Sequence, residues 1–414
     1  MREKLEFQAD RIETVLSVHK VPARVTGGTV TPRWIRFQVL PAVGAKISKI
    51  KRLSEEMAAA LNASNCRVSR DGASMSIEVP RDDPQPVRLL PLFRQLADDA
   101  PSIASGPGGA IPPATAVLGL AEDGAPLLIR LPSPDVAHIL VAGTTGSGKT
   151  VLLQTMILSL AMANPAPALF RGNGLGGGVA LVLVDPKGHA FGAFESAANS
   201  RLGSGPGLPH LARPVVKEVE EATEALNSLV RLMEKRGPVG NRSENGRQGE
   251  GPSHIVVVID ELADLVMTGG KEVQRALTRL TQRGREVGIH IIAATQKPTT
   301  AVLGSLIKAN FPVRIVGRVV SANDARTATG WSGTEAERLT GRGDFLAVAE
   351  GRLIRFQGAH VSPEEIQKTV ALLTSNGANG GSSTISPDAS SMHLPALLQP
   401  VNRLAEAFGG GMRG

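Results

Sequence analysis

The sequence predicts an α/β fold in which a mostly parallel central sheet is preceded by a small α/β domain. Three observations lead to this prediction. Between residues 116 and 375, short apolar runs alternate with helical stretches, and such runs are typical of strands buried on both faces of a parallel sheet. One run is followed directly by a glycine-rich loop and a helical stretch. Residues 1–100 mix strand-like and helical periodicity, and a Pro/Gly-rich linker at 101–115 separates them from the rest.

The small domain contains three segments with clear periodicity. The first, ARVTGGTVTPRWIRFQVLP, predicts two extended stretches joined at Gly27–Gly28. SMSIEVP alternates polar and apolar residues, as a half-buried strand does. Between them, one helix is predicted because five apolar residues share a face at helical spacing: Ile47, Ile50, Leu53, Met57 and Leu61.

The larger domain, residues 116–375, contains five apolar runs of strand length. They are HILVAG, VALVLVD, HIVVVID, GIHIIAAT and FPVRIVG. The Gly-rich segments between them predict surface loops. Residues 376–414 are rich in Gly and Ser and predict a flexible tail.

Composition narrows the class of protein. Of 414 residues, 42% are hydrophobic and 20% charged, which is ordinary for a globular protein. The single cysteine, Cys66, excludes an internal disulfide and fits a reducing compartment. The charged start MREKLEF is unlike a secretory signal, and the longest apolar run near the loop is too short to cross a bilayer. We therefore expect a cytoplasmic protein without a membrane segment in this chain.

The charge balance favours a polyanionic partner. The formal net charge is +7, the chain has no tyrosine, and aromatic residues make up only 3%. Proteins that grip single strands usually stack bases on aromatic side chains. If the partner is nucleic acid, contacts with the backbone of a duplex are therefore favoured.

The loop GTTGSGKT has the spacing of a phosphate-binding loop. It comprises Gly143, Thr144, Thr145, Gly146, Ser147, Gly148, Lys149 and Thr150. In a strand–loop–helix setting, the backbone N–H groups of the loop and of the helix start point at anions. Lys149 is predicted to reach the β- and γ-phosphates, and the Thr150 hydroxyl to bind Mg²⁺. The predicted ligands are therefore ATP and Mg²⁺.

Two acidic residues end the apolar run HIVVVID. Asp260 is predicted to orient a water of the Mg²⁺ ion, and Glu261 to polarise the attacking water. Asp260 could also cap the following helix, which is compatible with catalysis. Gln296, at the end of the next buried run, is placed to sense the γ-phosphate. For Lys297, local sequence does not separate a functional role from an ordinary solvated lysine.

Other polar residues are predicted to be structural. Five of the eight histidines stand singly, without metal-ligand spacing: residues 189, 210, 254, 290 and 360. GRGD at 341–344 predicts a turn before the strand FLAVA and is given no function.

Together, several motifs resemble the FtsK/SpoIIIE family of double-stranded DNA translocases. They are HILVAGTTGSGKT, LVDPKG, LPHLARPVV, VVVIDELADLVM, LTRLTQRGREVGIHIIAATQKP and LIKANFPVRI, and their order and spacing match as well. The first domain resembles the family's α domain, and residues 116–375 resemble its RecA-like P-loop ATPase domain.

The resemblance implies a homohexameric ring around duplex DNA, with ATP bound between neighbouring subunits. It assigns Lys149 and Thr150 to nucleotide and Mg²⁺, Asp260 and Glu261 to hydrolysis, and Gln296 to γ-phosphate sensing. Arg285 aligns with an arginine that reaches the neighbour's nucleotide in trans. Lys297 and Arg326 match pore-loop positions that contact the DNA backbone.

Three departures from the family pattern stand out. This chain lacks the membrane helices and long linker of division-type members, and residues 376–414 are too short and too Gly/Ser-rich for a winged-helix domain. Ala322 stands where relatives often place a lysine beside the neighbouring nucleotide. The first two departures put anchoring and directional loading in doubt but spare the motor. The third predicts that one trans contact is either missing or supplied by another residue. A chromosome, plasmid or mobile-element motor would fit, as would the motor portion of a longer protein.

Three other functions compete with a DNA motor. A type VII secretion-like motor would move polypeptide, but the small first domain and the single motor unit argue against it. A DNA-binding ATPase could use ATP for assembly without processive motion. A small-molecule kinase would have no use for Arg285 or the pore-loop residues.

Overall fold

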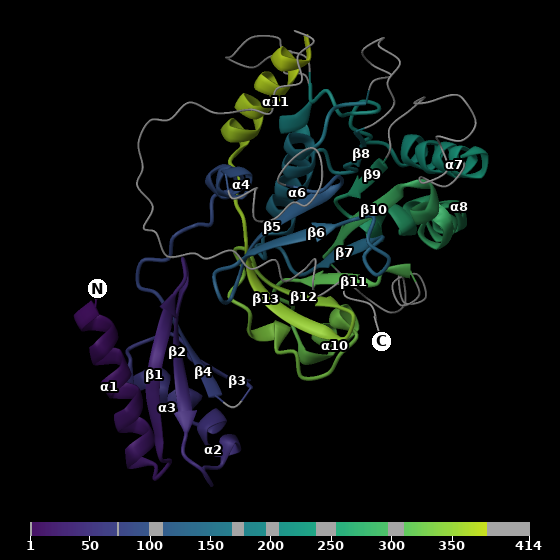
Figure 1. Cartoon of the computed structure of the whole chain (residues 1–414). Coiled ribbons are helices and arrows are strands. Elements are labelled where there is room, and N and C mark those ends of the chain that lie inside the picture. The colour runs from purple at the N-terminus through teal and green to yellow at the C-terminus, as the bar shows by residue number, and fades with distance from the viewer. Residues whose placement is uncertain are drawn as a thin grey trace, which may run out of the picture. The chain divides into compact units, whose positions relative to one another are not determined.

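The computed structural model describes residues 2–72, 74–98, 111–167, 178–195, 207–236, 254–296 and 310–378. By contacts between Cα atoms the chain divides into two compact units (Figure 1). The first comprises Met1–Val87 with Glu122–Gly124, and the second comprises Arg88–Ala121 with Ala125–Gly414.

The first unit contains a four-stranded antiparallel sheet with helices packed against it. Its elements are α1 (Arg2–Val18), β1 (Ala23–Val30), β2 (Trp34–Pro41), α2 (Ile47–Arg52), α3 (Ser54–Ala60), β3 (Arg67–Asp71) and β4 (Ser74–Pro80). The strand order is β1-β2-β4-β3. Ile12 and Leu16 of α1 join residues of the sheet and of α2 and α3 in one buried apolar cluster.

Three details of this unit differ from the predictions. The strand β1 continues through Gly27–Gly28 with a bulge after Val25, and the chain reverses over residues 31–33 instead. A Cβ at Gly28 would lie 2.8 Å from the Arg36 carbonyl oxygen, so this glycine serves a close approach of two strands rather than a turn. The single predicted helix is two helices that break at Leu53. The strand β4 is buried along both faces, and its polar face lies beside arginines of the neighbouring strands: Arg36 donates to Ser76, and Arg36 and Arg67 are paired with Glu78 in register.

The second unit is built on a nine-stranded sheet. Its strands are β5 (Thr115–Ala121), β6 (Pro126–Arg130), β7 (Ile139–Ala142), β8 (Val179–Val184), β9 (His254–Ile259), β10 (Ile289–Thr295), β11 (Val313–Val316), β12 (Asp344–Ala349) and β13 (Arg352–Gly358). The order is β6-β5-β13-β12-β11-β7-β10-β9-β8. The five predicted strands, β7 to β11, pair in parallel, as expected. The other four extend the sheet with antiparallel pairs.

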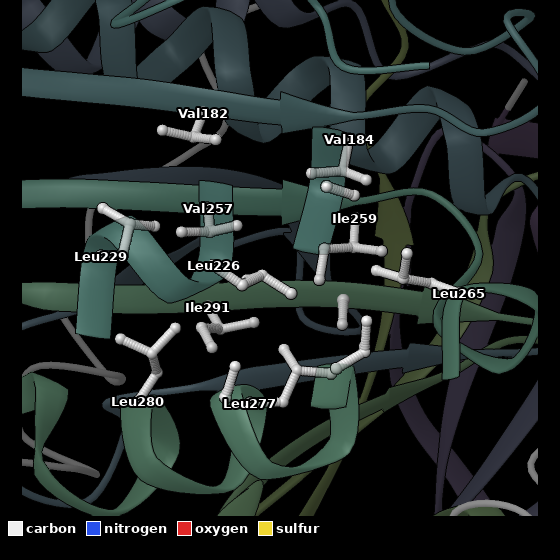
Figure 2. Packing of buried hydrophobic residues seen from close by; sticks show 14 of the residues in the cluster. Val182, Val184, Leu226, Leu229, Val257, Ile259, Leu265, Leu277, Leu280 and Ile291 are labelled. Atoms are coloured by element: carbon white, nitrogen blue, oxygen red, sulfur yellow. The ribbon is translucent and has the colours of Figure 1, made fainter. Parts of the chain in front are cut away.

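Helices cover both faces of the parallel part of the sheet. They are α6 (Lys149–Ala163), α7 (Val219–Lys235) and α8 (Leu262–Arg283). The connection from β7 to β8 runs along the sheet in one direction, and those from β8 to β9 and from β9 to β10 run in the other. Because such crossovers are right-handed, α6 lies on one face and α7 and α8 on the other. Figure 2 shows the core between β8, β9, β10 and the last two helices, where Leu226 of α7 and Leu277 of α8 meet strand residues such as Val257.

The small domain was predicted to extend to residue 100, whereas the first compact unit ends at Val87. Helix α4 (Leu89–Asp98) belongs to the second unit, where the Leu89 amide donates to the His360 carbonyl. Shorter elements of this unit are η2 (Gly192–Phe194), η4 (Gly284–Val287), α10 (Ala322–Thr329), η5 (Ala336–Arg338) and α11 (Pro363–Ala378). Residues 101–110 of the predicted linker and 379–414 of the predicted tail lie outside the described residues.

Candidate functional site: the phosphate loop and its surroundings

The predicted phosphate loop connects β7 to α6, in the strand–loop–helix setting that the sequence indicated. The helix begins at Lys149, and Gly148 before it has φ +101°. A Cβ at Gly148 would lie 2.8 Å from the Gly343 amide nitrogen, so both conformation and space require glycine. The loop therefore brings the start of α6 to the carboxyl end of the parallel strands, where α/β proteins place ligands.

The Lys149 side chain is folded over the loop. Its Nζ atom donates to the carbonyl oxygens of Gly143 and Thr144, at 2.7 and 3.1 Å, and the residue is 7% exposed. Burial lowers the pKa of Lys149, and the nearby carboxylates of Glu261 and Asp260 act in the opposite direction. The lysine is thus a buried cation held by backbone dipoles at the loop.

Thr150 and Asp260 meet at the start of α6. The Thr150 hydroxyl donates to Asp260 Oδ1 at 3.1 Å. Burial raises the pKa of Asp260, while the Thr150 bond lowers it and the charge of Asp185 raises it further. A hydroxyl and a carboxylate oxygen side by side are the hard oxygen donors that Mg²⁺ prefers, so these residues fit that ion.

Glu261 is linked to both the next strand and the loop. Its carboxylate accepts from the Thr295 hydroxyl at 2.8 Å and from the Gln296 amide at 3.2 Å, and it is 3% exposed. Gln296 Oε1 in turn accepts from the Thr145 hydroxyl at 3.0 Å. Burial raises the pKa of Glu261, and the two hydrogen bonds partly offset this. The structure therefore brings Glu261 and Gln296 together at the phosphate loop.

A distant turn also contacts this loop. The amides of Arg342 and Gly343 donate to the carbonyl oxygens of Gly146 and Ser147, at 3.0 and 2.8 Å. The turn is held by Gln357, whose Nε2 donates to the Arg342 carbonyl at 3.1 Å. GRGD at 341–344 was predicted to be a turn without a function, yet this turn contacts the phosphate loop. The predicted turn before a strand was the one feature of the sequence that pointed to it.

A buried ion pair fixes the end of this turn. Arg355 donates to the Asp344 carboxylate from Nε at 2.8 Å and from Nη2 at 2.9 Å, and both side chains are almost fully buried. Thr340 adds bonds from its amide and hydroxyl, at 2.9 and 3.0 Å. Burial raises the pKa of Asp344, but these four bonds outweigh burial and hold the pKa below its usual value. The turn at 341–343 is therefore braced from the hairpin of β12 and β13.

A further backbone contact comes from Arg318, two residues after the end of β11. The Arg318 carbonyl accepts from both the amide and the hydroxyl of Thr144, at 2.8 and 3.0 Å. The sequence does not indicate this contact, because any residue at position 318 would have the same backbone carbonyl.

Two predicted residues are not brought to the loop. Arg285 is exposed in η4, which precedes β10. It therefore lies at the amino ends of the parallel strands, opposite the carboxyl ends where the phosphate loop lies. Arg326 is exposed on α10. Lys297 lies outside the described residues. Ala322 begins α10, whose first turn is capped by Ser321 through a bond from the Asp324 amide.

Two of the histidines that were predicted to be structural lie next to each other in the second unit. His254 and His290 are both buried and contact each other, with Nδ1 and Nε2 at 3.2 Å. Burial, and after it the charge of the neighbouring His254, lowers the pKa of His290 to about 3. Among the described residues there is no group of three His, Cys, Asp or Glu able to hold a metal, and no helix there has the length and apolar character to span a membrane.

Comparison with known proteins follows the same division of the chain. The FtsK/SpoIIIE family model matches residues 112–239 and 237–300, and the FtsK alpha domain model matches residues 1–81. The chain is 33% identical over 393 residues to the DNA translocase SpoIIIE of Bacillus subtilis (strain 168), covering 89% of this chain and 45% of that protein. It is 34% identical over 392 residues to a DNA translocase FtsK of Staphylococcus epidermidis, covering 89% and 44%. The chain thus spans a little under half the length of these relatives.

Among solved structures, the pCW3 conjugation coupling protein TcpA, in its monomer form with ATPγS, has a similar fold. The TM-score is 0.52 at 20% sequence identity, over 87% of this chain and 99% of that one. This likeness concerns the fold alone, and it confirms the prediction of a RecA-like P-loop fold.

Proposed function

Because this chain belongs to the FtsK/SpoIIIE family, we propose that it is an ATP-driven motor that moves along double-stranded DNA as a ring of six copies. One observation carries the proposal: the phosphate loop is hydrogen-bonded to both strand ends, through Thr150 to Asp260 after β9 and through Thr145 to Gln296 after β10, whose backbone amide in turn bonds Glu261. That arrangement has the parts that phosphoryl transfer needs, which are a phosphate cradle, a metal-binding edge and a residue beside the attacking water.

The nucleotide site would work as follows. Lys149 would exchange its carbonyl partners for the β- and γ-phosphates. Thr150 and Asp260 would hold Mg²⁺, which would supply positive charge to neutralise the phosphates. Glu261 accepts a proton from the attacking water as its oxygen bonds to the γ-phosphorus and the bond to the β–γ bridging oxygen breaks, which yields ADP and phosphate. The raised pKa of Glu261 suits it to accept that proton. Gln296, bonded to the phosphate loop, would sense whether the γ-phosphate is present.

The ring supplies what a single copy does not. Arg285 lies at the amino ends of the parallel strands, whereas its own phosphate loop lies at their carboxyl ends. This position suits a residue that acts on a neighbour's nucleotide. Exposed Arg326, and Lys297 from outside the described residues, would follow the phosphates of duplex DNA without reading bases. The net charge of +7 supports such a partner.

Triplex displacement on a linear duplex tests the proposal. Wild-type protein with ATP should strip a third strand, and Lys149→Ala should not. Duplex-stimulated ATPase without displacement would refute processive motion and favour an assembly ATPase. Absence of any response to duplex would refute DNA as the cargo and point to polypeptide.

The ring itself needs a separate measurement. If Arg285 acts in trans, mixing Arg285→Ala subunits into wild type should inhibit the ATPase more steeply than dilution by inactive protein predicts. Loss in simple proportion to the added variant would exclude a shared site.

A further inference from the structure

The turn after β8 carries a lysine toward the two carboxylates of the nucleotide site. Strands β8 and β9 pair in parallel, with Val184 opposite Ile259, so the residues that follow them lie side by side. The Asp260 amide donates to the Val184 carbonyl at 3.1 Å. After β8 the chain makes a turn, in which the Gly188 amide donates to the Asp185 carbonyl at 3.0 Å. Lys187, within this turn, therefore stands beside the start of α8.

The Lys187 side chain is held by the first turn of α8. Its Nζ atom lies 2.8 Å from Asp264 Oδ2, and the two side chains are 45% and 50% exposed. An ion pair this exposed is weak, so its partners can be exchanged readily. Lys187 can leave Asp264 without stranding a buried charge, because water reaches that carboxylate.

The ammonium group of Lys187 also acts on the groups of the nucleotide site. Burial is the main influence on the pKa of Lys149, Asp260 and Glu261, and the positive charge of Lys187 lowers the pKa of each. All three belong to the proposed nucleotide site. A cation beside these groups would meet the additional negative charge that a triphosphate carries relative to a diphosphate.

We propose that Lys187 is a second phosphate-binding cation of the nucleotide site, which Asp264 holds in reserve and which moves to the γ-phosphate of a bound nucleoside triphosphate. The inference rests on the proposed ATP site. It assigns to Lys187 a role in telling ATP from ADP, separate from the role of Lys149 in binding both. Asp264 is a positioning residue, because it acts only through the lysine.

Dissociation constants for ADP and for the non-hydrolysable analogue AMP-PNP, both with Mg²⁺, test the assignment. We expect Lys187→Ala to reduce the preference for AMP-PNP over ADP about tenfold, since a hydrogen bond between charged groups is lost only with the triphosphate. Lys187→Arg should restore most of that preference. Asp264→Ala should keep the preference or increase it, because it frees the lysine.

Lys217 provides a matched control. Its Nζ atom lies 2.8 Å from Glu195 Oε2, and the lysine is 49% exposed, close to the 45% of Lys187. Lys217→Ala should leave the preference unchanged, and the melting temperature of each variant without nucleotide reports on folding. An unchanged preference in Lys187→Ala would overturn the proposal, as would equal losses in Lys187→Ala and Asp264→Ala. Failure of wild type to bind either nucleotide would instead overturn the ATP site itself, and this inference with it.

Discussion

Asp344→Asn should strongly destabilise the second unit. The carboxylate accepts four hydrogen bonds, two of them from Arg355, in a site where the aspartate is 1% and the arginine 8% exposed. At 2.8 Å and an effective dielectric constant of about 20, the attraction of the two charges is about 6 kcal/mol, which desolvation of both groups partly cancels. The amide leaves Arg355 without a counter-charge and turns an NH₂ group toward one of the donors. Losing one partner of a buried pair costs about 3–5 kcal/mol.

Urea unfolding followed by tryptophan fluorescence measures this loss. The chain has two tryptophans, Trp34 in the first unit and Trp331 in the second, so a Trp34→Phe background makes the signal specific to the unit that carries the pair. Asp264→Asn is the matched control in the same unit, since Asp264 pairs with Lys187 at 2.8 Å but is 50% exposed, and it should cost about 1 kcal/mol or less. A loss below about 1 kcal/mol in Asp344→Asn would refute the reasoning.

The same site yields three further predictions. The pKa of Asp344 is lower in the folded protein than in the unfolded chain, where it is about 3.9. The carboxylate therefore stabilises the fold fully above the unfolded pKa, and this stabilisation is lost as pH falls through the folded pKa. The difference in unfolding free energy between wild type and Asp344→Asn, measured by urea unfolding, should be constant above about pH 5 and shrink in acid. Gly148→Ala should cost about 1–3 kcal/mol of stability, because Gly148 has φ +101° and an added Cβ would lie 2.8 Å from the Gly343 nitrogen. The variant should also bind ATP more weakly in a titration, and an unchanged affinity would contradict this. Gln357→Leu should raise the dissociation constant for ATP several-fold by loosening the turn on the phosphate loop, whereas Gln38→Leu, which removes a similar strand glutamine of the first unit, should not.

Much of the fold was predictable because its determinants are local. Continuous apolar runs correctly indicated the five parallel strands, since burial on both faces leaves no room for alternation. Predictions failed where neighbours decided the outcome. Gly27–Gly28 looks like a turn in sequence, but the partner strand across the sheet keeps the chain extended there. The break at Leu53 likewise interrupts a helical pattern that continues on both sides.

Of the candidate site, the sequence by itself determined the chemistry: the glycines of the loop, Lys149 and Thr150, and the carboxylates after an apolar strand. These residue types and spacings are specific, because anion binding needs free N–H groups and a cation, and metal binding needs hard oxygens. The tertiary structure decided which other residues contact them. The brace at 341–343 is nearly two hundred residues away along the chain and acts through backbone N–H groups, which every residue but proline carries. The pairing of β8 with β9 likewise brings Lys187 to the site, and only the folded sheet establishes that register.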